Sequence, residues 1–123
     1  MDASALLAGL FAERGHERVM EVLERSAISS ANYSEVISRQ IRMGAKAEAA
    51  VANLERIDLP VIEWDAEMAS AAADLSPLAW THGLSLGDRI CLATARHKKL
   101  VALTADRKWI HLPPVGVQVE VIR

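Results

Sequence analysis

The chain of 123 residues is long enough for one hydrophobic core and too short for two ordinary domains. Its 51% hydrophobic content is consistent with one core, and its net charge of −2 argues against a strongly basic nucleic-acid binder, although it leaves a local basic groove open. Cys91 is the only cysteine, so an intrachain disulfide is excluded and a packed thiol in a reducing cytoplasm is expected. The sequence predicts neither a bilayer span nor a secretory signal.

Apolar spacing along the chain predicts helices that alternate with short strands. Helices are expected at 3–13, 15–26, 32–43 and 45–58, from residue 65, from Ser76-Pro77 and from about residue 86. Strands are expected at 27–30, 59–64 and 100–105, with an alternating edge strand at 117–122. This alternation predicts a single α/β domain over residues 1–123, with a mainly parallel sheet that has helices on both faces.

Four acidic residues stand where predicted helices begin. Ser85 and Asp88 form a capping-box pattern, and Asn32 and Glu35 repeat the same spacing before another apolar helix. Asp2 precedes the helical pattern ASALLAGLF. Taken singly, each acid is explained by the electrostatics of a helix terminus.

The predicted sheet also brings these acids to a common edge. Asp106 follows the buried strand VALTA, and in a parallel sheet the carboxyl ends of all strands share one edge, where ligands of open α/β sheets bind. The four carboxylates are therefore expected to meet, and their mutual repulsion raises their pKa values unless a cation compensates. Hard oxygen ligands favour Mg²⁺ or Mn²⁺.

Four segments resemble the acidic motifs of PIN-domain ribonucleases, and especially those of the VapC toxins of toxin–antitoxin pairs. The segments are DASALLA (2–8), SSANYSEV (29–36), LSLGDRICLATA (84–95) and VALTADRKW (101–109), so the resemblance spans essentially the whole chain. It implies a three-layer α/β/α sandwich, a homodimer and a small VapB-like antitoxin. It also implies that Asp2, Glu35, Asp88 and Asp106 are the acidic quartet, with Thr104 as a supporting hydroxyl.

The implied activity is metal-dependent cleavage of RNA. Asp2, Asp88 and Asp106 are assigned to metal binding, and Glu35 to the rim, where it orients the attacking water. Arg107 and Lys108 stand next to the last acid and are the strongest candidates for gripping RNA.

One departure from the family pattern concerns the start of the sheet. Family members carry a short apolar strand before the first acid, whereas here Asp2 follows Met1 directly. Strands 27–30 and 100–105 would then lack a common hydrogen-bonding partner, at about 1–3 kcal/mol for each unpaired buried group. The expectation is that upstream residues, or another segment or chain, fill this gap.

Two other functions fit part of the sequence. A phosphoacceptor receiver domain has a similar length and acids at strand ends, but the chain offers no clean match to its acidic pair, acceptor Asp and Lys. A catalytically inactive PIN-like module that binds RNA or protein remains open, and dependence of cleavage on a divalent ion separates it from the nuclease.

Overall fold

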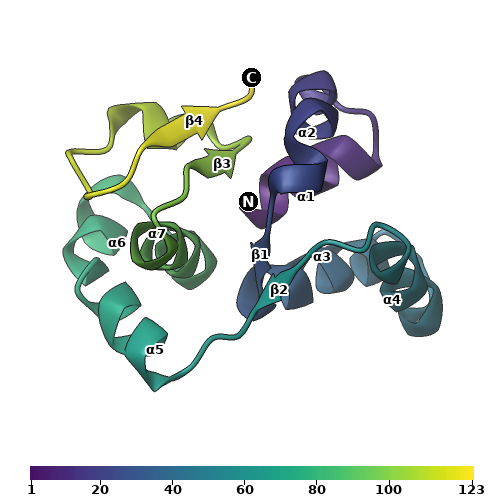
Figure 1. The fold of residues 1–123 in the computed structure, drawn as a ribbon, viewed down its shortest axis with the longest axis horizontal. Helices are drawn as coiled ribbons and strands as arrows, with labels where there is room; N and C mark the ends of the chain where they lie inside the picture. The colour runs from purple at the N-terminus through teal and green to yellow at the C-terminus, as the bar shows by residue number, and fades with distance from the viewer.

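The computed structural model describes residues 1–123 as a mixed fold of helices and short parallel strands (Figure 1). The α-helices are α1 (Ala3–Leu10), α2 (His16–Val22), α3 (Ser30–Arg42), α4 (Ala47–Glu55), α5 (Ala66–Ala73), α6 (Ser76–His82) and α7 (Leu86–Lys98). The strands are β1 (Ile28–Ser29), β2 (Val61–Ile62), β3 (Ala102–Thr104) and β4 (Val119–Val121), and two 3-10 turns are η1 (Leu23–Arg25) and η2 (Arg107–His111). None of the helices has the length and apolarity needed to cross a bilayer.

Most helices begin where a side chain can accept a hydrogen bond from the first turn. Asp2 caps α1, Asp65 caps α5, and Ser85 with Asp88 forms the predicted capping box of α7. The predicted capping box from Asn32 to Glu35 is wrong. The hydroxyl of Ser29 caps α3 instead and accepts from the Asn32 N–H, so the helix begins at Ser30 and the Asn32 side chain is free to turn inward.

The first predicted helix ends earlier than expected, at Leu10 rather than at residue 13, and the chain turns through Gly15 before α2 begins. Gly15 has φ of +89°, and a Cβ atom there would lie 2.4 Å from the carbonyl oxygen of Ile122. Only glycine fits this turn without moving the C-terminal segment.

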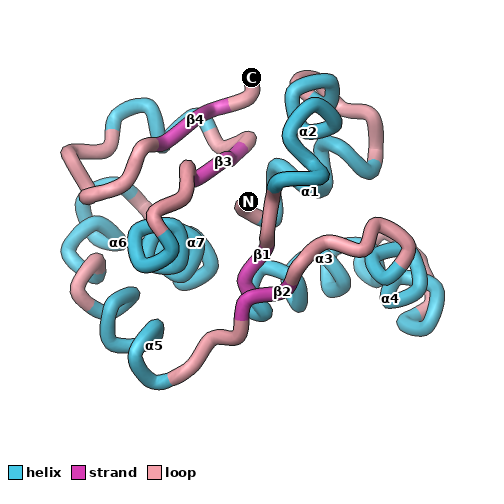
Figure 2. Tube along the Cα trace, in the orientation of Figure 1, coloured by secondary structure: helices cyan, strands magenta, loops and turns pink.

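The strands form two parallel pairs. β1 pairs with β2, with Ile28 opposite Val61, and β3 pairs with β4, with Ala102 opposite Val119. The predicted parallel pairing is therefore confirmed, but the pairs are separate two-stranded sheets rather than one continuous sheet. Figure 2 shows the N-terminus between the two pairs, with β3 on one side and β1 on the other.

Helices pack on both faces of β3, which gives this half of the molecule three layers. Ala102 packs in a cluster with Cys91 and Leu92 of α7. Leu103 points the opposite way, into a cluster with Ala5 of α1 and Val19 of α2. The burial of consecutive strand residues on opposite faces explains why this segment is an unbroken apolar run.

Candidate active site

Asp2 lies at the centre of the predicted site and is 3% exposed. Its Oδ2 atom accepts hydrogen bonds from the Ser4 hydroxyl (2.5 Å), the Ser4 N–H (3.2 Å) and the Thr104 hydroxyl (3.0 Å). Its Oδ1 atom accepts from the Asn32 amide at 3.3 Å. These hydrogen bonds satisfy both oxygen atoms of the buried carboxylate and hold Asp2 in one orientation.

Thr104 connects the first acid to the last. Its hydroxyl donates to Asp2 and accepts from the Asp106 N–H at 3.1 Å. Asp106 follows β3 and caps η2, because its Oδ1 atom accepts from the Lys108 N–H at 2.9 Å. Thr104 therefore lies between Asp2 and Asp106, at the carboxyl end of β3.

Asn32 connects the first acid to α7. This fully buried side chain donates to Asp2 Oδ1 and to the carbonyl oxygen of Gly87, both at 3.3 Å, while its own oxygen accepts from the Ser29 hydroxyl at 2.6 Å. Gly87 lies close to a third acid, since a Cβ atom there would lie 2.7 Å from Oε2 of Glu35. The absence of a side chain at residue 87 therefore lets the Glu35 carboxylate approach the start of α7.

Asp88 is held at the start of α7 by its capping box. Its Oδ2 atom accepts from the Ser85 N–H at 2.7 Å, and its own N–H donates to the Ser85 hydroxyl at 3.1 Å. Burial raises the pKa of Asp88, the hydrogen bonds from Ser85 oppose this shift, and the negative charges of Asp2 and Asp106 add to it. The cap therefore lies within the electrostatic reach of two other acids.

Glu35 shares this negative environment. Partial burial raises the pKa of its carboxyl, the charges of Asp2 and Asp88 raise it further, and Arg39 one turn along α3 opposes them. The structure thus brings all four predicted acids to one edge, with Asp2 at the centre and Glu35 at the exposed rim. This is an arrangement that an added cation would relieve.

The residues fit a hydrated divalent ion better than a closed protein cage. No three carboxylate, imidazole or thiolate side chains converge closely enough to enclose one ion. The donor chemistry nevertheless suits Mg²⁺ or Mn²⁺, because the acids supply hard oxygen atoms and Mg²⁺ is usually held by one or two carboxylates, several waters and substrate phosphates.

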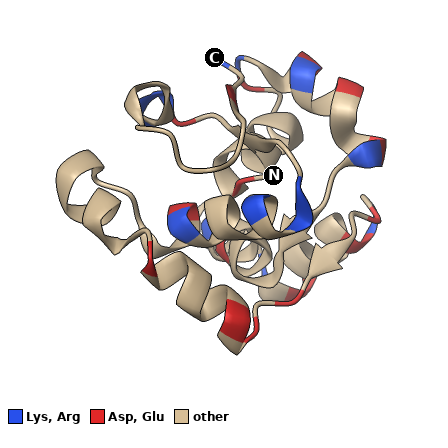
Figure 3. Ribbon diagram, turned by 60° about the vertical axis from the view of Figure 1, so that its left-hand side comes forward, with Lys and Arg blue, Asp and Glu red and all other residues tan.

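The two predicted RNA contacts lie beside the last acid. Arg107 and Lys108 are exposed at the start of η2, directly after Asp106. Elsewhere, basic and acidic segments are interspersed along the fold, as Figure 3 shows. Local cations near the acids, rather than a broad basic face, are therefore the groups available to hold a phosphate chain near the site.

Sequence reasoning missed three residues of this site, Ser4, Asn32 and Gly87. Ser4 lies two residues after Asp2, and its hydroxyl also accepts from the Ala105 N–H at 3.0 Å. Asn32 was interpreted as a helix cap, which hid its inward side chain. A glycine in the first turn of a predicted helix is the one signal that pointed to Gly87, because glycine is costly there unless space requires it.

Comparisons with known proteins support the fold. A crystal structure of DNA-bound VapBC from Salmonella typhimurium aligns with a TM-score of 0.71 and 22% identity over 99% of this chain and 96% of that chain. VapBC2 from Rickettsia felis, bound to a promoter DNA fragment, aligns with a TM-score of 0.71 and 16% identity over 98% and 95% of the two chains. PAE2754 from Pyrobaculum aerophilum aligns with a TM-score of 0.59 and 22% identity over 96% and 86%.

A search of curated proteins found no significant match. The family model for the PIN domain matches residues 1–113, which include all four acids and the hydroxyl and amide groups that hold them. The chain therefore belongs to the PIN-domain family.

Proposed function

We propose that this chain is a divalent-metal-dependent endoribonuclease, a toxin of the VapC type that cleaves RNA phosphodiesters. The observation that carries the proposal is the chain of hydrogen bonds that joins Asp2 to Asp106 through Thr104, and to the start of α7 through Asn32. Asp2 and Asp88 raise the pKa of Glu35, while Asp2 and Asp106 raise that of Asp88. Helix capping alone gives no reason for four acids from separate elements to gather in this way.

In this proposal three of the acids bind the ion, and the fourth lies at the rim of the site. Asp2, Asp88 and Asp106 would hold Mg²⁺ or Mn²⁺, which lowers the pKa of water and stabilises the charge that develops on the phosphate. Ser4, Thr104 and Asn32 fix the Asp2 carboxylate through the hydrogen bonds described above. Glu35 lies at the exposed rim, where its carboxylate would orient the attacking water.

The same proposal assigns partners. Arg107 and Lys108 would contact RNA phosphates on the side of Asp106, since both are exposed beside it. Two solved structures with this fold are of VapBC bound to DNA, which supports a VapB-like antitoxin as a second partner. A homodimer and a cytoplasmic location are expected for a single-domain toxin of this type.

Cleavage of total RNA by the purified chain tests the function. The assay uses Mg²⁺ or Mn²⁺, with EDTA in a parallel reaction, and compares the unmodified chain with Asp88→Asn and Asp65→Asn. Asparagine keeps a side-chain oxygen that can accept from the Ser85 N–H, while it removes the charge that the ion needs. Asp65 is the N-cap of α5 and accepts from the Met68 N–H at 2.9 Å, so Asp65→Asn is a control that removes a charge from the start of another helix.

The proposal expects discrete fragments that disappear with EDTA and with Asp88→Asn but persist with Asp65→Asn. Asp88→Asn should lower the cleavage rate by at least about a hundredfold, which corresponds to about 2.7 kcal/mol of lost transition-state stabilisation. Fragments that survive EDTA or Asp88→Asn would contradict the metal mechanism. A folded chain that binds RNA but never cleaves it would support an inactive PIN-like binding module instead.

A further inference from the structure

The turn that carries Asp106 is held from two sides. On one side, the Ala105 N–H donates to the Ser4 hydroxyl at 3.0 Å, and the Asp106 N–H donates to the Thr104 hydroxyl at 3.1 Å. On the side of β4, the Ala105 carbonyl oxygen accepts from Nε of Arg123 at 3.3 Å. Arg123 belongs to none of the acidic motifs and lies outside residues 1–113, which the family model matches.

The Arg123 side chain bonds to the turn at the point where the ladder between β3 and β4 ends. The last main-chain bond of this ladder runs from the Ile122 N–H to the Thr104 carbonyl oxygen at 3.0 Å. An unbroken parallel ladder would next join the Asp106 N–H to the carbonyl oxygen of Ile122. The Asp106 N–H donates to the Thr104 hydroxyl instead, so the chain leaves the sheet here. Beyond this point, Arg123 supplies the hydrogen bond between the two segments.

The Arg123 guanidinium is itself held by Glu13. Its Nη1 atom donates to Oε2 of Glu13 at 2.7 Å, so two nitrogen atoms of the planar group have fixed partners. Glu13 lies in the turn between α1 and α2, where its N–H donates to Ala8 at 2.9 Å and its carbonyl oxygen accepts from His16 at 3.0 Å. Main-chain hydrogen bonds therefore fix the turn from which Glu13 holds the guanidinium.

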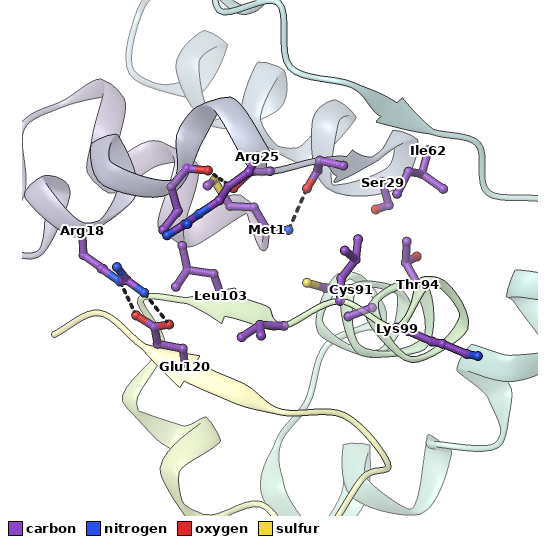
Figure 4. Close-up of a pocket in the computed structure, with 16 residues that line it drawn as sticks. Met1, Arg18, Arg25, Ser29, Ile62, Cys91, Thr94, Lys99, Leu103 and Glu120 are labelled. Carbon is purple, nitrogen blue, oxygen red and sulfur yellow. Dashed lines mark hydrogen bonds and ion pairs between the residues drawn. The ribbon is translucent and has the colours of Figure 1, made fainter.

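β4 has a separate attachment that does not need Arg123. Figure 4 shows the contact between Arg18 of α2 and Glu120 of β4, with hydrogen bonds to both carboxylate oxygen atoms at 2.5 and 3.1 Å. The strand is also paired with β3 over its whole length. Loss of the Arg123 side chain should therefore leave β4 in place and act on the turn at Ala105.

The position of Asp106 depends on this turn. Both oxygen atoms of Asp2 accept side-chain hydrogen bonds, which fix that carboxylate directly. The Asp106 carboxylate, by contrast, accepts from the Lys108 N–H alone, at 2.9 Å to Oδ1. Its place at the acidic edge is therefore set mainly by the main chain of residues 104–106, which Arg123 holds.

We propose that Arg123 is a positioning residue for the ion site. Its Nε–H holds the Ala105 carbonyl and so fixes the turn that presents Asp106, while Glu13 fixes the guanidinium. Arg123 needs no contact with the ion, because it acts through the main chain, as the hydrogen-bonded neighbours of metal ligands do when they orient those ligands. The inference rests on the proposed function, in which Asp106 binds the divalent ion.

The direction of the effect on ion affinity separates positioning from charge. A cation beside the acids repels a divalent ion, so Arg123→Ala should strengthen Mn²⁺ binding if Arg123 acts only through its charge. If Arg123 positions Asp106, the same change should weaken Mn²⁺ binding, because the turn gains freedom.

Arg96→Ala is the matched control. The Arg96 Nη2 atom donates to the carbonyl oxygen of Ala71 at 3.3 Å, between α7 and α5. This hydrogen bond has the same length and the same type of acceptor as the bond from Arg123 to Ala105. The control therefore removes an equivalent contact and the same charge from another part of the fold.

Two measurements on the full chain test the proposal. Electron paramagnetic resonance of free Mn²⁺ at neutral pH gives the ion affinity, and hydrogen–deuterium exchange in metal-free buffer, resolved by NMR, follows the Ala105 and Asp106 amides. Arg123→Ala should weaken the affinity about tenfold and speed the exchange of both amides about tenfold. Glu13→Ala should change both quantities in the same direction and by less, because the guanidinium keeps its bond to Ala105. Arg96→Ala should leave both quantities within about twofold of the unmodified chain.

Several results would overturn the proposal. These are stronger or unchanged Mn²⁺ binding in Arg123→Ala, unchanged exchange of the two amides, and an equal loss of affinity in Arg96→Ala. Absence of Mn²⁺ binding by the unmodified chain would instead contradict the proposed function. The exchange rates need no ion, so they would still show in that case whether Arg123 fixes the turn.

Discussion

Asp88 illustrates how one residue serves two purposes. Its capping box was predictable because Ser85 and Asp88 have the spacing that lets each side chain accept from the other's N–H. Its proximity to Asp2 and Asp106 depends on chain segments about 86 and 18 residues away, so local spacing could not provide it. Asn32 is a case in which the local spacing predicted the wrong role. The Ser29 hydroxyl caps α3, and the Asn32 side chain donates to Asp2 instead.

Glu35 should make stability depend on pH. A carboxyl whose pKa is raised on folding holds its proton more tightly in the folded state than in the unfolded state. Its contribution to the free energy of unfolding is therefore fully present below its ordinary pKa of 4.5 and is lost as pH rises through the raised value. Glu35→Gln should flatten this decline, as measured by urea unfolding in a metal-free buffer series from about pH 4 to pH 8.

Glu48→Gln provides the control for that series. Glu48 is an exposed residue of α4, so its replacement removes the same charge without touching the acidic cluster. The expected pH profile is that of the unmodified chain. A decline that is equally steep in Glu35→Gln and in the unmodified chain would mean that Glu35 does not feel the neighbouring charges.

At the scale of elements, Asn32 ties α3 to the start of α7 and to the first acid. Asn32→Ala would leave Asp2 Oδ1 and the Gly87 carbonyl without this donor. The expected loss is about 1–3 kcal/mol in the free energy of unfolding, measured in urea, together with at least a tenfold loss of RNA cleavage. The second effect follows because Asp2 would no longer be held in one orientation.

Asn53→Ala is the matched control for this prediction. The Asn53 side chain of α4 donates to the Gln40 side chain of α3 at 3.0 Å. Asn53→Ala therefore breaks an amide hydrogen bond to α3, the helix that also carries Asn32. Asn53→Ala should lower the free energy of unfolding. It should lower RNA cleavage only in proportion to the fraction of the chain that is unfolded. Equal losses of cleavage in the two variants would show that Asn32 contributes only to stability.

Gly87 tests the contact between α7 and Glu35. Alanine favours a helix by up to about 1 kcal/mol relative to glycine, and the atom it meets, Glu35 Oε2, is the end of a flexible side chain. Gly87→Ala should therefore keep or raise the free energy of unfolding in urea while lowering the cleavage rate about tenfold, because the carboxylate must move. In a chain that already carries Glu35→Gln, Gly87→Ala should lower the cleavage rate no further. A further tenfold loss in that background would show that Gly87 affects cleavage independently of Glu35.

The order of elements was more predictable than their lengths. Apolar periodicity predicted one helix that begins at residue 65 and another that begins at about residue 86. The structure has helices at Ala66–Ala73 and Leu86–Lys98. The strands are only two or three residues long, shorter than the apolar runs that contain them. Strand length depends on pairing partners, and β1 and β3 each have only one.

At the scale of the whole molecule, contacts between distant segments join α2 and the turn before it to β4 and the C-terminal residue. Arg18 of α2 makes two hydrogen bonds to Glu120 of β4, at 2.5 and 3.1 Å. Arg123 pairs with Glu13 at 2.7 Å. These contacts join sequence positions more than 100 residues apart, so no local pattern revealed them. The alternation of elements did predict the parallel architecture, because few topologies bury such a pattern.

The most direct test of the account is binding of Mn²⁺ at neutral pH, measured by electron paramagnetic resonance of the free ion. Asp2, Asp88 and Asp106 should hold Mn²⁺ in the unmodified chain and equally in Asp65→Asn, whereas Asp88→Asn should weaken the affinity at least tenfold, which is about 1.4 kcal/mol. Equal affinity in Asp88→Asn and the unmodified chain, or no binding by either folded protein, would contradict an ion site built from these carboxylates.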